Sequence, residues 1–383
     1  KDYWNYPFLI FGSIILISAI SQNFFFFNKY EDIWDPLLSF YGLGNWLPFI
    51  WFFWAFQPYI NSISKRRKFA LALITGTFPV FITGFGQYFF NWHGPFETLN
   101  GLIIWYQRPI INPAGLSGLF NNQNYAGSWL NLAWPFCIAL FLDIKNNILK
   151  RAIVLGFVLS VGFAAFLTYS RNAWLGLITT LPILIGKKVI IFLLSILIIF
   201  ALIFALSDFP DEIIETPNYL KNFLPDKVLL EFTDEGYIDQ DVSRLEIFKS
   251  ALNLILLNPI FGIGAASFPA IYFSETNFWK GHSHNLLFEL AVSYGVPSTI
   301  IFFMIFSIIL IFAGKIIFFN KRINGSSILD RAFWTALFVF LISQMVDIQY
   351  FDGKISIVIW ILLAGLKTII EDKANNNNIL NKF

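Results

Sequence analysis

The sequence predicts an all-α, polytopic membrane helix bundle that forms a single transmembrane domain over residues 1–383. Three observations carry this prediction. The chain is 57% hydrophobic and 13% charged, with a mean hydropathy of +0.64, whereas a soluble domain carries about 25% charged residues. Its apolar residues gather in runs long enough to cross a bilayer as helices. The segments that connect these runs alternate between basic and acidic.

Ten apolar runs are predicted to span the membrane. They cover residues 8–27, 42–60, 69–90, 125–142, 152–170, 173–186, 188–207, 286–314, 332–347 and 354–370. The eighth run is long, and the sequence Gly295-Val296-Pro297 predicts a kink that ends a short first helix within it.

The charge of the connecting segments predicts the orientation of the bundle. Most of the 26 lysines and arginines lie in one set of segments, which includes residues 65–68, 145–151, 187–188 and 315–331. Cytoplasmic loops of membrane proteins are enriched in lysine and arginine, so this set is predicted to be cytoplasmic. Both termini then lie inside, and the remaining segments face outward.

The main outward-facing region is residues 208–285, a long loop inserted between the seventh and eighth spans. Within it, Ser243-Arg244-Leu245-Glu246 forms a capping box that predicts the start of a helix. Apolar residues at 245, 248, 252, 255 and 256 continue with helical spacing until Asn258-Pro259 stops it. We expect this amphipathic helix to lie along the outer surface of the bundle. Residues 371–383, which are rich in asparagine, are predicted to be a disordered tail.

Four ionisable residues from three separate stretches are predicted to meet at the outer face. Arg171 lies at the outer end of the fifth run, Arg244 starts the outer helix, and His282 and His284 close the long loop. Arginine suits phosphate because its planar fork donates paired hydrogen bonds and stays charged. Two arginines would hold a diphosphate and stabilise the charge on a leaving group. A histidine nearby would accept a proton from an attacking hydroxyl.

Structural alternatives remain open for each of these residues. Arg171 would also serve as an interfacial anchor, Arg244 as a surface ion-pair partner, and His284 as a helix cap. A structural role is the simpler interpretation for His282 and for His93.

Other chemistries are less well supported by the sequence. It contains no P-loop, Rossmann glycine pattern or metalloprotease helix motif. The two neighbouring histidines offer metal-ligand atoms, but the sequence fixes no third ligand. Asp347 and Asp352 flank the outer end of the ninth run. They would serve as a cation site, but solvated loop acids are the simpler interpretation. The lone Cys137 excludes an intrachain disulfide.

The ordered motifs around these residues resemble the O-antigen ligase and polymerase superfamily. The resemblance rests on Ser170-Arg171-Asn172-Ala173-Trp174, on Arg244, on residues 258–264, and on His284-Asn285 followed after nine residues by Gly295. Residues 118–124, which end in Asn124, also resemble a family segment ahead of a span. The chain departs from the family pattern at Ser298, where a second glycine is usual.

This resemblance implies a metal-independent, inverting glycosyltransferase without a cofactor, placed in the bacterial inner membrane with its active site facing the periplasm. The donor would be a glycan on undecaprenyl diphosphate, and the acceptor lipid A–core or another glycan; no nucleic acid is involved. By the same resemblance Arg171 and Arg244 would bind the diphosphate and His284 would activate the acceptor hydroxyl. The supporting residues would be His282, Asn285, Gly295 and Asn124.

Three alternatives to ligation follow from the same sequence. The acceptor would be a second lipid-linked repeat in a polymerase, or a protein hydroxyl in a protein O-oligosaccharyltransferase. A different class is a membrane transporter linked to inorganic carbon uptake, which would place ionisable residues near the bilayer midplane. Most ionisable residues here lie at span ends, with Glu289 as the main exception.

Overall fold

The computed structural model describes residues 4–24, 30, 32–110, 114–120, 122–186, 244–319 and 328–375. Apart from one short hairpin, the regular secondary structure of these residues is helical, which confirms the predicted all-α fold. The helices are α1 Asn5–Phe24, α2 Leu38–Gly42, η1 Leu43–Asn45, α3 Leu47–Ile60, α4 Ile63–Phe90, α5 Gln123–Asp143, α6 Ile148–Leu167, α7 Arg171–Ile185, α11 Arg244–Leu257, α12 Ser267–Thr276, α13 Leu286–Gly314, the π-helix η3 Lys315–Phe319, α14 Ile328–Ser343 and α15 Gly353–Asn375.

Nine of the ten predicted spans coincide with helices, and the seventh, residues 188–207, lies outside the described residues. Among the described helices, α1, α4, α5, α6, α13 with η3, and α15 are long and apolar enough to cross a membrane. Several boundaries differ from the prediction by a few residues, and two of the differences involve polar segments. Helix α4 begins at Ile63 and so includes the basic residues 65–68. Helix α15 continues to Asn375, past the predicted start of the tail.

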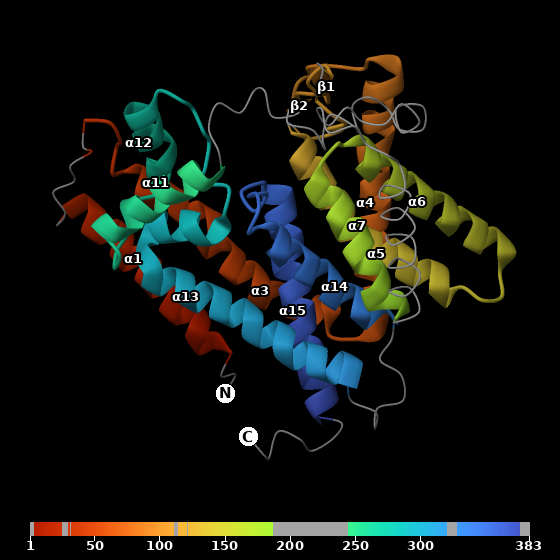
Figure 1. Cartoon of the computed structure of the whole chain (residues 1–383). Coiled ribbons are helices and arrows are strands. Elements are labelled where there is room, and N and C mark those ends of the chain that lie inside the picture. The colour runs from red at the N-terminus through yellow and green to blue at the C-terminus, as the bar shows by residue number, and fades with distance from the viewer. Residues whose placement is uncertain are drawn as a thin grey trace, which may run out of the picture. The chain divides into compact units, whose positions relative to one another are not determined.

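Internal contacts divide the chain into two compact units, with the boundary inside α4. The first unit holds residues 1–71 and 240–383. In it α1 packs against α13, while α3 and α14 pack against α15, as Figure 1 shows. Helices α11 and α12 pack on the first part of α13 around a small apolar core that includes Ile247, Leu254, Phe268 and Val292.

Helix α13 is interrupted at Gly295, which confirms the predicted kink. Gly295 has φ +88° and ψ 167°, so two helical segments meet there. A Cβ atom at this position would lie 2.0 Å from the carbonyl oxygen of Ile260, so only glycine fits.

The polar backbone groups at this break find partners from elsewhere in the first unit. The carbonyl oxygen of Ser293 accepts a hydrogen bond from Gln22 at 2.9 Å, and that of Tyr294 accepts one from Ser18 at 3.0 Å. The backbone N–H of Val296 donates to Pro259 at 2.8 Å. An interrupted helix within a bundle is stable when neighbouring groups satisfy its backbone in this way.

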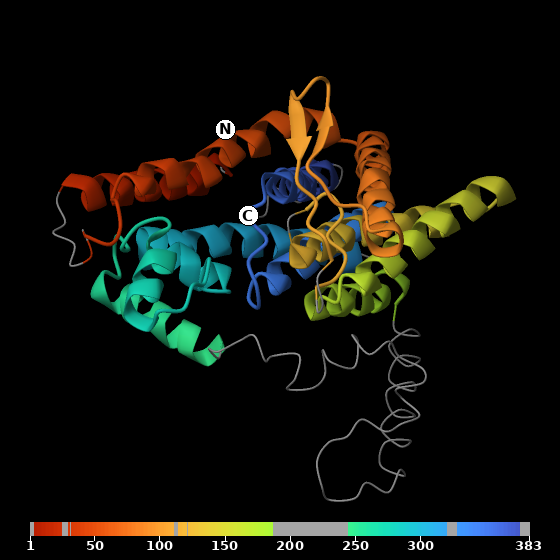
Figure 2. The ribbon, with the colours of Figure 1, turned by 90° about the horizontal axis from the view of Figure 1, so that it is seen from above.

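The second unit covers residues 72–239, and in its described part α5 packs against α6 and α7. Gly127 makes one close approach possible, because a Cβ atom there would lie 2.7 Å from the Cβ of Ala173 in α7. The segment between α4 and α5 contains the antiparallel hairpin of β1 Phe96–Thr98 and β2 Ile103–Trp105, the two arrows in Figure 2.

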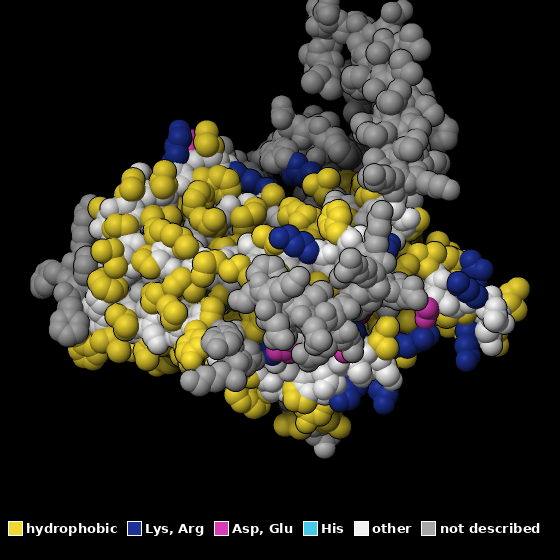
Figure 3. Space-filling model, turned by 90° about the horizontal axis from the view of Figure 1, so that it is seen from below, with side chains coloured by type: hydrophobic (Ala, Val, Ile, Leu, Met, Phe, Trp, Pro, Cys, Tyr) yellow, Lys and Arg dark blue, Asp and Glu magenta, His cyan; other side chains and the backbone are white. Residues whose placement is uncertain are grey.

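The described surface is rich in apolar side chains, as expected for helices that face lipid. Figure 3 shows hydrophobic side chains covering much of the visible face, with lysines and arginines in a few places. Inside the first unit, Arg66 and Asp330 form a buried ion pair at 3.0 Å, with both side chains 2% exposed. Both residues come from segments predicted to be cytoplasmic, so this contact agrees with the predicted orientation.

Candidate functional site

The site is built on the segment that leads into α13. Asn285 caps this helix, because its side-chain oxygen accepts hydrogen bonds from the backbone N–H groups of Leu287 and Phe288. Its side-chain nitrogen donates to the carbonyl oxygen of Met345 at 3.0 Å, and the N–H of Leu286 donates to Gln344 at 2.9 Å. Asn285 therefore fixes the histidine segment to the turn that follows α14.

His284 is bonded to the carboxylate of Asp347. Its Nδ1 lies 2.8 Å from Oδ1 of Asp347. A carboxylate only accepts hydrogen bonds, so Nδ1 carries the proton and donates it. The second ring nitrogen, Nε2, forms no hydrogen bond with a described residue. The backbone of His284 has φ +55°, a left-handed conformation that is rare for histidine and that clusters at functional sites.

Asp347 is held in place from its other side. Its Oδ2 accepts a hydrogen bond from Gln349 at 3.0 Å, and the side chain of Gln349 accepts one from Gln344 at 2.9 Å. Asp347 is only 7% exposed, so its interpretation as a solvated loop acid was wrong. Burial by itself raises the pKa of Asp347, but the hydrogen bond from His284 and the electrostatic interactions with both histidine rings and with Arg244 outweigh it and lower the pKa below its usual value. Asp347 is therefore ionised at neutral pH.

His282 supports the backbone of His284. Its Nδ1 accepts the hydrogen bond of the His284 N–H at 3.1 Å, which places the proton of the neutral ring on Nε2. That Nε2 lies 3.9 Å from Oδ1 of Asp347. Burial lowers the pKa of His282 to about 4, against a smaller opposite effect of Asp347. A neutral ring that accepts a backbone hydrogen bond agrees with the structural role inferred from the sequence.

The same three residues also have the spacing of a metal site. One ligand atom from each of His282, His284 and Asp347 lies within 4.8 Å of the others. The hydrogen bonds do not fit a metal well, however. Nδ1 of His284 points its proton at Asp347, and Nε2 of His282 carries the proton that a metal would have to displace. The arrangement is instead that of a hydrogen-bonded pair, His284 with Asp347, in which His282 holds the backbone of His284 in place.

Arg244 lies in the same unit as this pair. It begins α11, and its charge lowers the pKa of Asp347, which places the guanidinium within electrostatic reach of the carboxylate. Helix α11 is fixed to α13 by the rings of Phe248 and Phe288, whose centroids are 5.4 Å apart. Ser243, the predicted cap of α11, lies outside the described residues.

Arg171 and Asn124 lie in the second unit. Arg171 is the first residue of α7, where the side chain of Ser170 accepts the N–H of Ala173 at 3.4 Å. Asn124 lies in the first turn of α5, and the contact of Gly127 with Ala173 brings these two helix starts together. The structure thus brings together His284, His282, Asn285, Gly295 and Arg244 in one unit, and Arg171 and Asn124 in the other. That Arg171 meets His284 stays a prediction.

Sequence comparisons agree with the predicted resemblance and confirm it. Residues 155–303 match the O-antigen ligase family, a range that contains Arg171, Arg244, His284 and Gly295. The chain is 23% identical over 314 residues to the teichuronic acid biosynthesis protein TuaE of Bacillus subtilis (strain 168). This similarity covers 77% of the chain and 59% of the relative, so the chain spans somewhat over half of that protein's length. Both similarities support a membrane enzyme of the ligase or polymerase kind.

Proposed function

We propose that this chain, which is similar to O-antigen ligases, transfers a glycan from undecaprenyl diphosphate to lipid A–core or a related acceptor at the periplasmic face of the bacterial inner membrane. The observation that carries the proposal is the pair of His284 and Asp347. A buried, ionised carboxylate at 2.8 Å fixes the ring and its tautomer and leaves Nε2 available as a base.

In the proposed reaction the acceptor hydroxyl gives its proton to Nε2 of His284. The hydroxyl oxygen then forms a bond to the anomeric carbon of the first donor sugar. The bond between that carbon and the diphosphate oxygen breaks, and its electron pair leaves with the lipid diphosphate. Attack from the face opposite the leaving group inverts the anomeric configuration. Asp347 stabilises the imidazolium that forms on His284, as the carboxylate does in hydrolase triads.

The two arginines are proposed to hold the diphosphate. Arg244 is in the same unit as His284, and its exposed side chain is available to an anionic ligand. Arg171 stands at the N-terminus of α7, where backbone N–H groups and the helix dipole also favour anions. Paired hydrogen bonds from guanidinium groups would offset the charge that develops on the leaving group, so no metal ion is required for this step.

Polymerisation is the second candidate, since the relative is named for the biosynthesis of teichuronic acid. In that case the acceptor hydroxyl belongs to another lipid-linked repeat, and His284 has the same role. The product distinguishes the candidates: a capped lipid A–core, a longer lipid-linked chain, or, for protein O-glycosylation, a glycosylated protein.

The decisive experiment replaces the proposed base. His284→Ala, assayed in proteoliposomes with a lipid-linked glycan and its acceptor, is expected to reduce transfer by a factor on the order of 10³ or more, because no other group would accept the proton. His93→Ala is the matched control, since His93 is an exposed histidine bonded to the backbone of Asn91. Normal transfer by His284→Ala would refute the assignment.

The same assay tests the proposed role of the two arginines and whether the reaction needs a metal ion. Arg171→Lys and Arg244→Lys each keep the positive charge but remove the paired hydrogen-bond donors of the guanidinium group. Each change is therefore expected to slow transfer about tenfold or more. Treatment with a chelator is expected to leave the rate unchanged. A rate that falls with chelation and recovers with one divalent ion would instead place a metal on His282, His284 and Asp347.

A further inference from the structure

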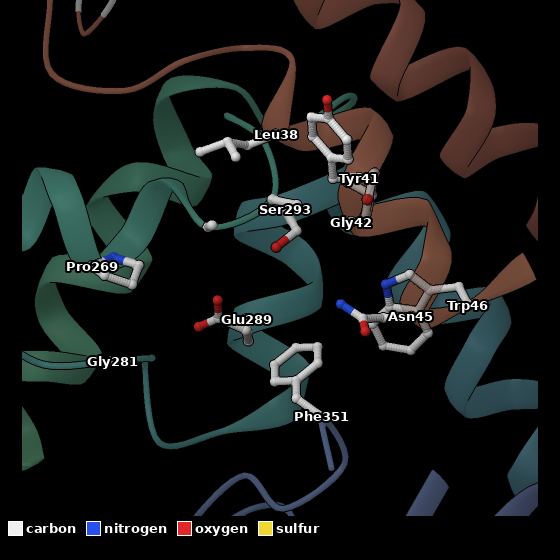
Figure 4. Close-up of a pocket in the computed structure, with 13 residues that line it drawn as sticks. Leu38, Tyr41, Gly42, Asn45, Trp46, Pro269, Gly281, Glu289, Ser293 and Phe351 are labelled. Carbon is white, nitrogen blue, oxygen red and sulfur yellow. The ribbon is translucent and has the colours of Figure 1, made fainter. Parts of the chain in front are cut away.

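A pocket of about 310 Å³ opens beside the histidine segment in the first unit. Gly281, three residues before His284, lines it, and so do the start of α13, the loop before α12, and the residues from α2 to the start of α3. Figure 4 shows these elements surrounding the pocket. The pocket is therefore formed by the same unit as the proposed catalytic base, and the segment that carries His284 forms part of its lining at Gly281.

Three polar side chains point into this pocket, as Figure 4 shows: Glu289 and Ser293, one turn apart on α13, and Asn45 from η1. Glu289 is 4% exposed, and one of its carboxylate oxygens accepts the N–H of Ser283 at 2.8 Å. The Ser293 hydroxyl and the Asn45 amide form no hydrogen bond with a described residue. Ser293 is buried, at 5% exposed, whereas Asn45 is exposed. A buried hydroxyl normally finds a partner, so a ligand in the pocket can satisfy Ser293 and also bond to Asn45 and Glu289.

Aromatic side chains form the walls. Trp46, Tyr41 and Phe351 line the pocket, and Trp46 is held rigid by stacking on Tyr350 with ring centroids 4.7 Å apart. Aromatic faces pack well against the apolar C–H faces of sugar rings, while neighbouring carboxylate, amide and hydroxyl groups bond to sugar hydroxyls. A volume of this size holds a sugar ring with its substituents.

The charge of the pocket argues against other ligands. None of the described residues that line it is a lysine, arginine or histidine, so the pocket offers no cation to hold a diphosphate. A lone ammonium group would pair with Glu289 but would leave Asn45 and Ser293 unmatched. A neutral ring that carries several hydroxyls satisfies all three polar groups.

We propose that this pocket binds one sugar ring of a glycan substrate beside His284, with Glu289, Ser293 and Asn45 bonded to its hydroxyls. This inference rests on the proposed glycan transfer and adds to it a subsite for the sugar. The hydrogen bond between Glu289 and Ser283 also links the pocket to the histidine segment, so a bound ring would stand at a fixed position relative to the base.

The test uses the full chain in proteoliposomes, with the lipid-linked glycan and the acceptor isolated from the source bacterium. Ser293→Ala and Asn45→Ala are combined, because each removes one hydrogen bond and adds no bulk. The double variant is expected to raise the KM for one glycan substrate about tenfold and to leave kcat within about twofold. Ser298→Ala is the matched control, since the Ser298 hydroxyl bonds only to carbonyl groups of its own helix, at Tyr294 and Gly295.

The two substrates are varied separately, so the experiment also identifies which ring is bound. A higher KM for the acceptor assigns the pocket to the acceptor sugar, and a higher KM for the donor assigns it to the donor glycan. An unchanged KM for both substrates, or an equal effect of Ser298→Ala, overturns the proposal.

Failure of the proposed function would be seen separately, as a wild-type chain that transfers no glycan. The pocket is then tested by saturation-transfer NMR with the glycans released from their lipids. A signal that the double variant loses and Ser298→Ala retains supports the sugar site. No signal with the wild-type chain overturns it.

Discussion

His284 combines an unusual backbone with a well-connected side chain. A left-handed φ costs a non-glycine residue about 1–2 kcal/mol, and three neighbours offset this: the ring of His282 on its N–H, Asp347 on its Nδ1, and the cap residue Asn285 after it. The result is an imidazole whose position does not depend on substrate. Such preorganisation is what a general base needs.

Asp347 was not predicted as a site residue, although His284, Arg171 and Arg244 were. It lies 63 residues from His284, and no local motif links the two. One signal was present in the sequence. Ser343, Gln344, Asp347 and Gln349 place four hydrogen-bonding side chains at the end of one apolar run, and polar groups at membrane depth are rarely kept without a function.

Replacing Asp347 by asparagine is expected to lower kcat by a factor on the order of 10²–10⁴ with little change in KM. The amide no longer stabilises the imidazolium, and its NH₂ group can favour the wrong tautomer of His284. The measurement is the transfer rate in proteoliposomes. Asp352→Asn is the control, because Asp352 pairs with the exposed Lys354 at 3.2 Å. Equal rates for both variants would remove Asp347 from the mechanism.

His282 makes the stability of the fold depend on pH. Its pKa is lowered to about 4 in the folded chain, compared with 6.5 for the free side chain, so between these values the unfolded chain binds a proton that the folded chain does not. Stability is therefore complete above about pH 6.5 and decreases as the pH falls toward 4.

The variant His282→Asn tests this dependence, because asparagine keeps an acceptor for the His284 N–H but does not titrate. The difference in Tm between pH 7 and pH 5 in detergent is expected to be smaller than in the wild-type chain. A difference of the same size in both proteins would show that another group causes the acid sensitivity.

Among the helices, α13 depends most clearly on one residue, the glycine at position 295. Its break at Gly295 was predicted from Gly295-Val296-Pro297, and the need for glycine follows from the approach of Ile260. The end of helix α11 before Asn258 was also predicted correctly, but the sequence did not show which of its faces is buried. The buried residues are Ile247, Ala251, Leu254 and Ile255, whereas Leu245, Leu252 and Leu256 of the predicted apolar set are exposed. Both faces of α11 are apolar, so periodicity alone does not choose between them.

Gly295→Ala is expected to destabilise the protein by about 2–4 kcal/mol, from the left-handed φ and the contact with the Ile260 carbonyl together. Because the break positions the segment that carries His284, transfer should fall as well. Gly156→Ala in α6 is the matched control, since a Cβ atom there meets nothing within 4 Å. The measurement is the Tm in detergent, and an equal Tm for both variants would contradict the strain argument.

At the scale of the whole molecule, composition and run length were sufficient for the fold class and for nine of the described helical segments, six of which are long and apolar enough to cross a membrane. Composition and run length did not predict which helices pack together. Helix α3 packs against α15 and α1 against α13, and the segments in each pair are more than 250 residues apart. Such pairs depend on side-chain fit, which a single sequence does not encode in any local pattern. The pocket rings Trp46, Tyr41 and Phe351 were missed for the same reason, since they come from distant segments.

The predicted orientation can be tested by cysteine labelling, because the one natural cysteine, Cys137, is buried. Trp279→Cys is expected to react with a membrane-impermeant maleimide in intact spheroplasts, and Lys145→Cys only after the membrane is opened. Both positions are exposed in the structure. The reverse pattern would place the histidine segment on the cytoplasmic side and contradict the periplasmic site.

The interruption in α13 also bears on how the chain is made. Its carbonyl groups at Ser293 and Tyr294 are satisfied by Gln22 and Ser18 of α1, which leave the ribosome more than 270 residues earlier. In hydrocarbon an unsatisfied carbonyl costs several kcal/mol. Helix α13 therefore reaches its final hydrogen bonding only by pairing with a helix made much earlier in synthesis, so the α1–α13 contact forms late relative to the insertion of α1.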